Sequence, residues 1–597
     1  MKNKAQIIFL ALVAIISTYL ISTIMIFLVN KIGLKRIVEI YSIKLPYEAI
    51  LNNYPNVWTA FGISFIISLA GVIALFLTSK DNNKQFGNAR FANFNEIKKM
   101  KLFGDKGIII GKYGNKILKF AGQQFVALGA PTRSGKGVGI VIPNLLEWDQ
   151  SAVVQDIKQE CFDYTSKYRK EILKQEVYLF NPFSSKTHRY NPLTYIDMSD
   201  KEKCDSQLMD FANILYPITG DSTTQFFNQL AQNLFIGLCY LWADLNLKED
   251  GRAFQEAFDI KSEFNLYGIL QLSKGFEIEY GGQSINGFDD TYKYLKSCED
   301  LLSEPTKRRI ETYINIDSAN TKSGVMSSFN APLTPFEGET LRLTTKTSDF
   351  DLRDLRKKKT TIYIGITPDQ LTNAKFILNI FWSQLILLNT KELPQKNKDL
   401  KYSCLLVMDE FTAPGQIPIL QTAISFIAGF NLRLLMIYQS LSQLETPAPL
   451  GYGKEGAKTL LTNHACQIFY APREMEDAEA ISKILGTKTV KQTSRSYSGG
   501  QNGGSRSVSE ASRALMLPQE LREMPFEKEI VTIDSGKPIL CNKAFYYSDP
   551  YFMDKYKLIA PSLKNIKGAF VPSRDKFETA ILNNETNIKI PKIGEIA

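Results

Sequence analysis

Histidine is scarce in this 597-residue sequence, which contains only His188 and His464. Neither has a cysteine or a second histidine at metal-ligand spacing, so histidine-based catalysis and a histidine-containing zinc site are not expected. The seven cysteines are odd in number, scattered along the chain and never arranged as C-x-x-C. This pattern argues against a disulfide framework and favours a reducing compartment.

Charge is missing from two long segments near the start of the chain. Residues 5–30 and 57–78 contain no charged side chain. At about 1.5 Å per residue, a helix over either run can cross a hydrocarbon layer of ~30 Å. A cleavable signal peptide is the alternative for the first run, but its apolar core would be only about 7–15 residues long. We therefore expect two transmembrane helices in an anchor that covers residues 1–80.

The pattern beyond residue 80 changes to short β-like runs that alternate with helical stretches. This alternation predicts an α/β fold in which helices cover a parallel sheet. The expected strands are Phe125–Leu128, Ala152–Asp156, Thr361–Ile364, Leu405–Met408, Leu432–Tyr438 and Gln467–Tyr470, and the expected helices are Phe376–Leu388, Ile417–Phe430 and Glu474–Leu485. We assign this nucleotide-binding type of domain to residues 81–196 and 331–560, and a C-terminal tail to residues 561–597.

Residues 197–330 interrupt the alternation with helix-like segments such as Gln225–Leu245 and Thr291–Ile316, so we expect an all-α insertion there. The segment contains 12 lysine and arginine residues against 21 aspartate and glutamate residues, a net charge of −9. Since the whole chain carries +10, the remainder carries +19. The acidic charge fits either an ordinary solvated surface or a docking face for basic cargo, and the sequence leaves both open.

A serine- and glycine-rich run covers residues 493–512 and includes S-G-G-Q-N-G-G-S. Its composition predicts a mobile loop within the α/β domain.

The segment Gly129–Gly137 reads G-A-P-T-R-S-G-K-G and joins an expected strand to an apolar stretch. A phosphate-binding loop needs small residues that let backbone N–H groups wrap a phosphate, together with a helix N-terminus and a lysine. Gly135 and Lys136 meet that need. Ala130 replaces the first glycine of the general motif, and Gly137 stands where a magnesium-binding hydroxyl is usual. A plain strand-to-helix turn with a surface lysine is the alternative.

A second motif is the apolar strand that ends in Asp409 and Glu410. A strand beside the phosphate loop would place Asp409 near a magnesium ion and Glu410 near the attacking water. A third strand ends before Gln439, whose amide could sense the γ-phosphate. Each feature alone is compatible with ordinary surface residues, but their combination favours an ATPase.

These residues resemble the coupling proteins of type IV secretion systems, the TraG/TraD-like branch of the FtsK–HerA P-loop ATPases. The resemblance rests on A-P-T-R-S-G-K-G-V at 130–138, D-I-K at 156–158, Y-N-P-L at 190–193, M-D-E-F at 408–411 and Y-Q-S at 438–440. I-S-K-I-L-G at 481–486 and L-P-Q-E-L at 517–521 also look similar. A glycine at the position of Gly137 is familiar in that family.

The resemblance implies a RecA-like ATPase core with an all-α insertion that uses ATP and Mg²⁺. The residues implied in nucleotide binding are Thr132, Arg133, Ser134, Gly135, Lys136, Gly137 and Val138. Those implied in catalysis are Lys136, Asp409, Glu410 and Gln439, with Asp409 as the metal ligand. An arginine from a neighbouring subunit would complete the site, and Arg433 is one candidate for it.

The resemblance also implies a homo-hexamer at the bacterial inner membrane, with channel components and a relaxase–DNA complex or effector proteins as partners. Lysine and arginine counts around the two spans leave their orientation open. A cytoplasmic ATPase would place both termini inside the cell and residues 31–56 outside. Two alternatives remain at this point, namely a DNA pump in segregation or packaging and a membrane receptor that binds nucleotide without hydrolysis.

Overall fold

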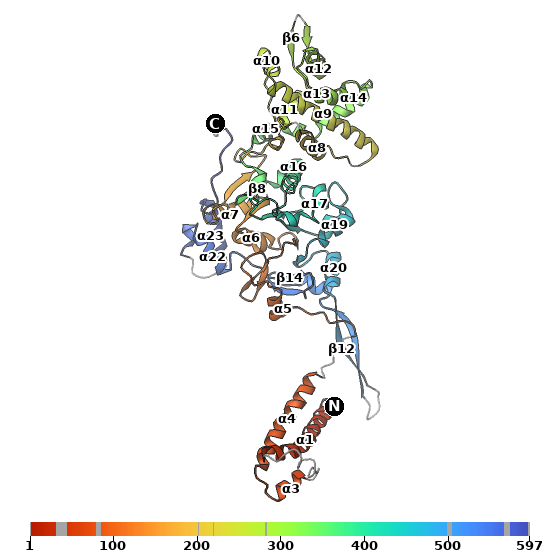
Figure 1. The fold of residues 1–597 in the computed structure, drawn as a ribbon, viewed down its shortest axis with the longest axis vertical. Helices are drawn as coiled ribbons and strands as arrows, with labels where there is room; N and C mark the ends of the chain where they lie inside the picture. The colour runs from red at the N-terminus through yellow and green to blue at the C-terminus, as the bar shows by residue number, and fades with distance from the viewer. Residues whose placement is uncertain are drawn as a thin grey trace. The chain divides into compact units, whose positions relative to one another are not determined.

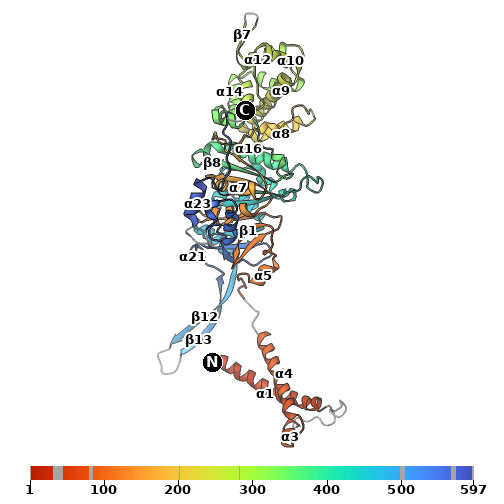
Figure 2. The ribbon, with the colours of Figure 1, turned by 90° about the vertical axis from the view of Figure 1, so that its left-hand side faces the viewer.

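A computed structural model of the chain describes residues 2–30, 45–78, 85–200, 202–218, 220–280, 283–497, 504–565 and 573–594. Its contacts separate two compact units, which are described in turn. The first contains residues 1–88 and 488–512, and the second contains residues 89–487 and 513–597. Figures 1 and 2 show the ribbon from two directions.

The first unit contains two long apolar helices, α1 (Lys2–Val29) and α4 (Val57–Thr78), with the short helix α3 (Leu45–Leu51) between them. The two long helices pack against each other, with Ile26, Val57 and Ala60 buried at their contact. Windows of both, Ala11–Val29 and Val57–Ala74, are long and apolar enough to cross a membrane. These helices agree with the two predicted spans, whereas most of the predicted external loop, residues 31–44, lies outside the described residues.

A two-stranded hairpin of β12 (Thr487–Tyr497) and β13 (Gly504–Ala514) contributes most of its residues to the same unit. The predicted mobile loop at 493–512 is therefore wrong for the residues that the structure describes, which pair as strands. Composition misled the prediction because antiparallel pairing uses backbone N–H and C=O groups, which a serine-rich segment supplies as well as any other.

The second unit is built on an 11-stranded mixed sheet in the order β2-β1-β15-β14-β11-β3-β10-β9-β4-β8-β5. Its strands are β1 (Ile108–Tyr113), β2 (Lys116–Phe120), β3 (Val126–Gly129), β4 (Ser151–Ile157), β5 (Glu176–Phe180), β8 (Thr360–Ile366), β9 (Cys404–Asp409), β10 (Leu432–Tyr438), β11 (Cys466–Phe469), β14 (Lys528–Ile533) and β15 (Ile539–Asn542). The run from β11 to β5 is parallel, whereas β14, β15, β1 and β2 extend it by antiparallel pairing. All six predicted strands lie in the parallel run.

Helices cover both faces of the parallel strands, which explains why these strands are apolar throughout. In β9, Leu406 and Met408 face the core beneath α16, whereas Leu405 and Val407 face the core beneath α6 and α7. The helices around the sheet are α5 (Phe94–Lys99), α6 (Ile142–Glu147), α7 (Glu160–Glu171), α15 (Glu339–Thr344), α16 (Leu371–Asn389), α17 (Pro418–Ala423), α18 (Leu441–Glu445), α19 (Gly453–Thr462), α20 (Met475–Leu485) and α21 (Pro518–Arg522).

A helical insertion enters after β5 and returns to the sheet at β8 (Figure 1). Its helices are α8 (Cys204–Leu215), α9 (Ser222–Leu247), α10 (Glu249–Ala257), α11 (Leu266–Leu272), α12 (Gly287–Ser297), α13 (Glu304–Ile314) and α14 (Ala319–Asn330). One short hairpin, β6 (Ile278–Tyr280) with β7 (Gln283–Ile285), interrupts the helices. The helix-like segment predicted at 291–316 contains parts of two helices, α12 and α13, because Ser303 and Pro305 start a new helix there.

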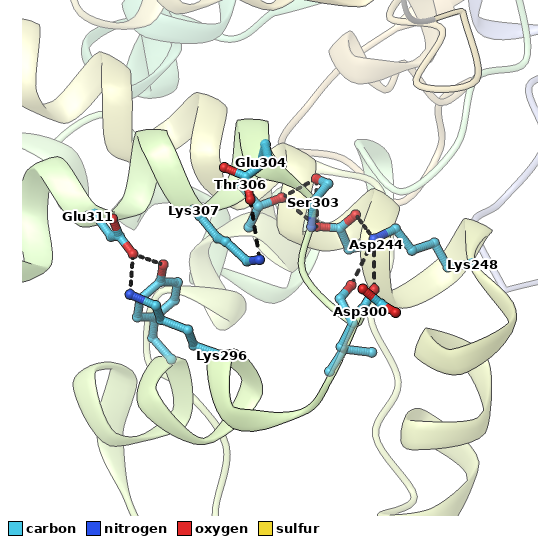
Figure 3. Close-up of polar contacts among 11 residues, drawn as sticks. Asp244, Lys248, Lys296, Asp300, Ser303, Glu304, Thr306, Lys307 and Glu311 are labelled. Atoms are coloured by element: carbon cyan, nitrogen blue, oxygen red, sulfur yellow. Dashed lines mark hydrogen bonds and ion pairs between the residues drawn. The ribbon is translucent and has the colours of Figure 1, made fainter.

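Asp244 of α9 supports the start of α13, as Figure 3 shows. Its Oδ2 accepts hydrogen bonds from Ser303 N at 2.8 Å, Ser303 Oγ at 2.9 Å and Thr306 Oγ1 at 2.5 Å. Lys248 Nζ lies 3.1 Å from its other carboxylate oxygen. The carboxylate therefore satisfies a free N–H of the new helix from a neighbouring helix.

Helix α16 belongs both to the sheet and to the insertion. Its Gln384 accepts a hydrogen bond from Tyr190 Oη at 2.5 Å and donates one to Pro192 O at 2.8 Å, just before the insertion begins. Buried apolar residues of the insertion and of this sheet face form one continuous cluster. The insertion is thus packed onto the sheet rather than tethered to it.

Residues after 548 pack on the opposite face. Phe552 and Tyr556 of α22 (Pro550–Lys557) and Phe577 of α23 (Ser573–Leu582) share a core with Ile142 and Leu146 of α6. Phe577 of the predicted tail therefore belongs to the same buried core as the helix that follows the phosphate loop.

Candidate nucleotide-binding site

The loop between β3 and α6 turns sharply before its helix begins. Arg133 and Gly135 both have positive φ angles, of 58° and 87°. A Cβ at Gly135 would stand 3.0 Å from the Phe526 ring, a tight contact, and the positive φ there favours glycine. The helical turn Gly137–Val141 starts directly after Lys136 and continues into α6. Backbone N–H groups at this start are available to an anion.

Lys136 meets the two predicted carboxylates of β9. Its Nζ lies 2.5 Å from Glu410 Oε1 and 3.0 Å from Asp409 Oδ1. Burial alone would lower the pKa of Lys136, but the two negative charges outweigh it and the pKa is raised. The lysine is therefore charged and is held at the carboxyl edge of the sheet.

Asp409 ends β9 with its carboxylate buried, and burial raises its pKa despite the nearby lysine. Its Oδ1 is buried and accepts no hydrogen bond, although Lys136 is within ion-pair distance. Mg²⁺ usually takes one or two carboxylates together with phosphates and waters. A buried carboxylate beside a phosphate-type loop fits such an ion.

Glu410 is positioned by residues from three other elements. Gln439, just after β10, donates a hydrogen bond to its carboxylate. Gln155 of β4 donates to its backbone carbonyl at 2.8 Å, and Trp382 of α16 in turn donates to Gln155 at 3.0 Å. Glu410 itself has a φ of 74°, an unusual backbone conformation for a glutamate.

The structure brings together Lys136, Asp409, Glu410 and Gln439 although they lie up to about 300 residues apart in sequence. One detail differs from the sequence prediction, because β10 stands between β3 and β9 instead of the two being neighbours. The three strands still end at the same edge, because all are parallel.

The remaining loop residues face other partners. Arg473 donates to Thr132 Oγ1 and O, at 3.2 and 3.0 Å, and Lys543 donates to Ser134 O at 2.8 Å. Val138 O accepts a hydrogen bond from Tyr546 N at 3.3 Å. Thr132 and Arg133 are exposed.

Four of the supporting residues, Gln155, Trp382, Arg473 and Lys543, were not predicted from the sequence. Only Gln155 carried a visible signal, as a polar residue inside an apolar strand.

Asp156 lies near the site but has a structural role. Its carboxylate accepts from Cys161 N at 3.0 Å and Phe162 N at 2.7 Å, which supports the first turn of α7. Burial raises the pKa of this carboxyl to about 7, and the charge of Asp409 adds to the shift.

Arg433 does not fit the predicted role of an arginine supplied to a neighbouring subunit. Its side chain is only 7% exposed, packs over Trp148 and donates to Phe120 O at 3.1 Å. Burial lowers its pKa to about 10. It sits near the start of β10, whereas the site lies at the opposite end of that strand, so the candidate is wrong.

Comparisons with known proteins identify the family of this chain. The model of the type IV secretory system conjugative DNA transfer family matches residues 82–567. Protein VirD4 of Rhizobium radiobacter is 29% identical over 82% of this chain and 68% of its own length. Conjugal transfer protein TraG of Escherichia coli is 24% identical over 85% of each chain.

Solved structures show the same fold. The bacterial conjugative coupling protein TrwB in complex with sulphate has a TM-score of 0.55 at 15% identity, covering 77% of this chain and 94% of that one. TrwB in complex with ADP and Mg²⁺ has a TM-score of 0.53 at 14% identity, with coverages of 77% and 97%. With a family match over most of its length, this chain belongs to the type IV secretory system conjugative DNA transfer family, as the resemblance of its motifs to the coupling proteins predicted.

Proposed function

We propose that this protein is a membrane-anchored ATPase that recruits macromolecules and delivers them to a type IV secretion channel. The observation that carries the proposal is the meeting of Lys136, Asp409, Glu410 and Gln439 at one edge of a RecA-like sheet. TrwB has been solved with the ATP analogue ADPNP and with ADP and Mg²⁺, which supports the same ligands here. Membership of the conjugative DNA transfer family makes the two alternative functions less suitable.

Each site residue has a chemical task in this proposal. The backbone of residues 132–138 would bind phosphate, and Lys136 would turn from the carboxylates to the β- and γ-phosphates. Asp409 would hold Mg²⁺, which supplies positive charge against the phosphates when bound. Glu410 would accept the proton of the attacking water, and Gln439 would hold Glu410 in place.

ATP hydrolysis by the detergent-solubilised full chain tests the proposal. Replacing Lys136 by alanine removes the phosphate-binding charge from a partly exposed loop and leaves no apolar cavity. We expect hydrolysis to fall about 100-fold or more while the circular dichroism spectrum is unchanged. Lys401→Ala is the control, since this exposed lysine precedes the opposite end of β9. Equal hydrolysis by the Lys136 and Lys401 variants would refute the site.

The two apolar helices would anchor the protein in the bacterial inner membrane as a multi-pass protein. We place both termini and the ATPase domain in the cytoplasm, where ATP is available, and residues 31–56 on the other side. We further propose a homo-hexamer that contacts the channel components, with each site completed by an arginine other than Arg433.

The helical insertion is our candidate for cargo recruitment. Six of its lysines are already paired with its own carboxylates, at Asp200, Asp244, Asp289, Asp290, Glu304 and Glu311. The excess acidic charge of the segment, −9, therefore falls on the other carboxylates, including exposed Glu249 and Glu256 of α10. A basic protein tail or basic relaxase would be attracted, and a DNA backbone repelled.

Charge reversal on α10 tests this recruitment. We expect Glu249→Lys with Glu256→Lys to weaken binding of a basic secretion-signal peptide to the full chain several-fold, with the difference shrinking as salt is raised. The matched control reverses two exposed glutamates elsewhere, Glu455 and Glu523. Stronger binding of duplex DNA than of the peptide by the unsubstituted protein at moderate salt would argue against the proposal.

A further inference from the structure

Three aromatic rings form a stack beside the phosphate loop. The ring centroids of Phe526 and Phe545 are 5.6 Å apart with an interplanar angle of 11°. Those of Phe545 and Tyr547 are 5.5 Å apart with an angle of 19°. Neither the phosphate-binding nor the hydrolytic roles proposed above require these rings.

The stack lies directly against the loop. A Cβ at Gly135 would stand 3.0 Å from Phe526 Cζ and 3.4 Å from Phe545 Cε1. Lys543 joins the two features, because its Nζ donates to Ser134 O and lies 4.5 Å from the centre of the Phe526 ring. Any triphosphate held by Gly135 and Lys136 therefore has an aromatic surface next to it.

Phe526 ends the stack and is half exposed. Its exposed fraction is 51%, whereas Lys543 and Tyr470 beneath it are buried. The Tyr470 ring lies 3.8 Å from Lys543 Nζ on the inner side. Burial lowers the pKa of Lys543 to about 8, because little water reaches its ammonium group on this inner side. About half of the Phe526 side chain is thus exposed beside the phosphate loop.

A cleft adjoins the stack at Lys543 and Phe545, although Phe526 does not line it. An open cleft of about 460 Å³ is bordered by Lys543, Phe545, Glu527 and Asn542. This volume lies within the ~300–1,000 Å³ range of small-molecule sites. Two of its lining residues, Lys543 and Phe545, are those that contact the phosphate loop.

We propose that the base of the bound nucleoside triphosphate stacks on the exposed part of the Phe526 ring. The inference rests on the nucleotide site proposed above. It assigns a binding residue to the base, for which the phosphate loop provides no partner. Stacking on a π-face tolerates different bases, because every base has such a face. Phe526 is therefore a binding residue for purine nucleotides in general and does not distinguish adenine from guanine.

Binding to the full chain in detergent tests this assignment, with ATP, GTP and inorganic tripolyphosphate as separate probes in titration calorimetry. We expect Phe526→Ala to weaken ATP and GTP about tenfold and to leave tripolyphosphate unchanged, because only the base contact is lost. Phe526→Trp should keep the affinity for ATP. The matched control is Phe226→Ala, which removes an equally exposed phenylalanine, also 51%, from α9.

Three results would overturn the assignment. An equal loss of ATP and tripolyphosphate binding in Phe526→Ala would show that the ring only supports the loop. Unchanged ATP affinity in that variant would place the base elsewhere. Failure of the unsubstituted protein to bind either ATP or tripolyphosphate would instead remove the nucleotide site itself, and the stacking with it.

Discussion

At the scale of single residues, the carboxylate of Glu410 shows how the site balances its charges. It contacts Lys136 on one oxygen and Gln439 on the other. Its neighbour Asp409 also pairs with Lys136, so one lysine faces two carboxylates. Removing the charge of Glu410 therefore removes the proposed proton acceptor. It also leaves Lys136 with one carboxylate fewer to compete with a phosphate.

Glu410→Gln should separate binding from hydrolysis. The amide keeps the size of the side chain but cannot take a proton from water, so we expect hydrolysis to fall about 10²–10⁴-fold. Nucleotide affinity should be equal or higher, because Lys136 loses one competing charge. Calorimetry and a phosphate-release assay on the full chain measure the two effects, with Glu523→Gln as control. Lost affinity with normal turnover of the bound nucleotide would contradict this role.

Sequence motifs predicted which residues form the site but not the neighbouring side chains that hold them in position. Lys136, Asp409 and Glu410 follow apolar strands, and parallel strands end at one edge, so their meeting could be predicted. Gln155 and Trp382 are linked to Glu410 only through the pairing of β4 with β9 and the packing of α16. Arg433 was misjudged because a sequence does not show which residues of an apolar strand are covered.

At the scale of elements, the central parallel strands were predicted and the antiparallel extension was not. The buried strands are uninterrupted apolar runs, which are easily recognised. The added strands carry polar or charged residues, namely Lys112 in β1, Lys116 and Lys119 in β2, Lys528 and Glu529 in β14, and Asn542 in β15. The hairpin of β12 and β13 is polar, so its strand pairing could not be read from hydrophobic periodicity.

The start of α13 depends on Asp244 from α9. We expect Asp244→Ala to lower the free energy of opening of α13 by about 1–3 kcal/mol, because the helix loses a buried capping carboxylate. Amide hydrogen exchange of α13 in the full chain measures this change. The control Asp290→Ala breaks an exposed ion pair with Lys293 and should leave exchange unchanged. Equal effects of the two variants would show that capping by Asp244 is unimportant.

At the scale of the whole molecule, the two apolar helices and the sheet belong to separate compact units. A chain without residues 1–80 should therefore be soluble and bind ATP with near-normal affinity, while assembling less well. Size-exclusion chromatography and calorimetry test these expectations. An insoluble product that binds no ATP would show that the α/β unit needs the anchor to fold.

The placement of α16 has a mechanical consequence. Through Trp382 and Gln155 it is connected to the backbone of Glu410, and through Gln384 to the chain that enters the insertion. Packed interiors yield little and transmit displacement. A shift of the Glu410 segment on loss of a phosphate would thus be passed through α16 to the helical insertion, which would couple the proposed nucleotide site to the proposed cargo-binding surface.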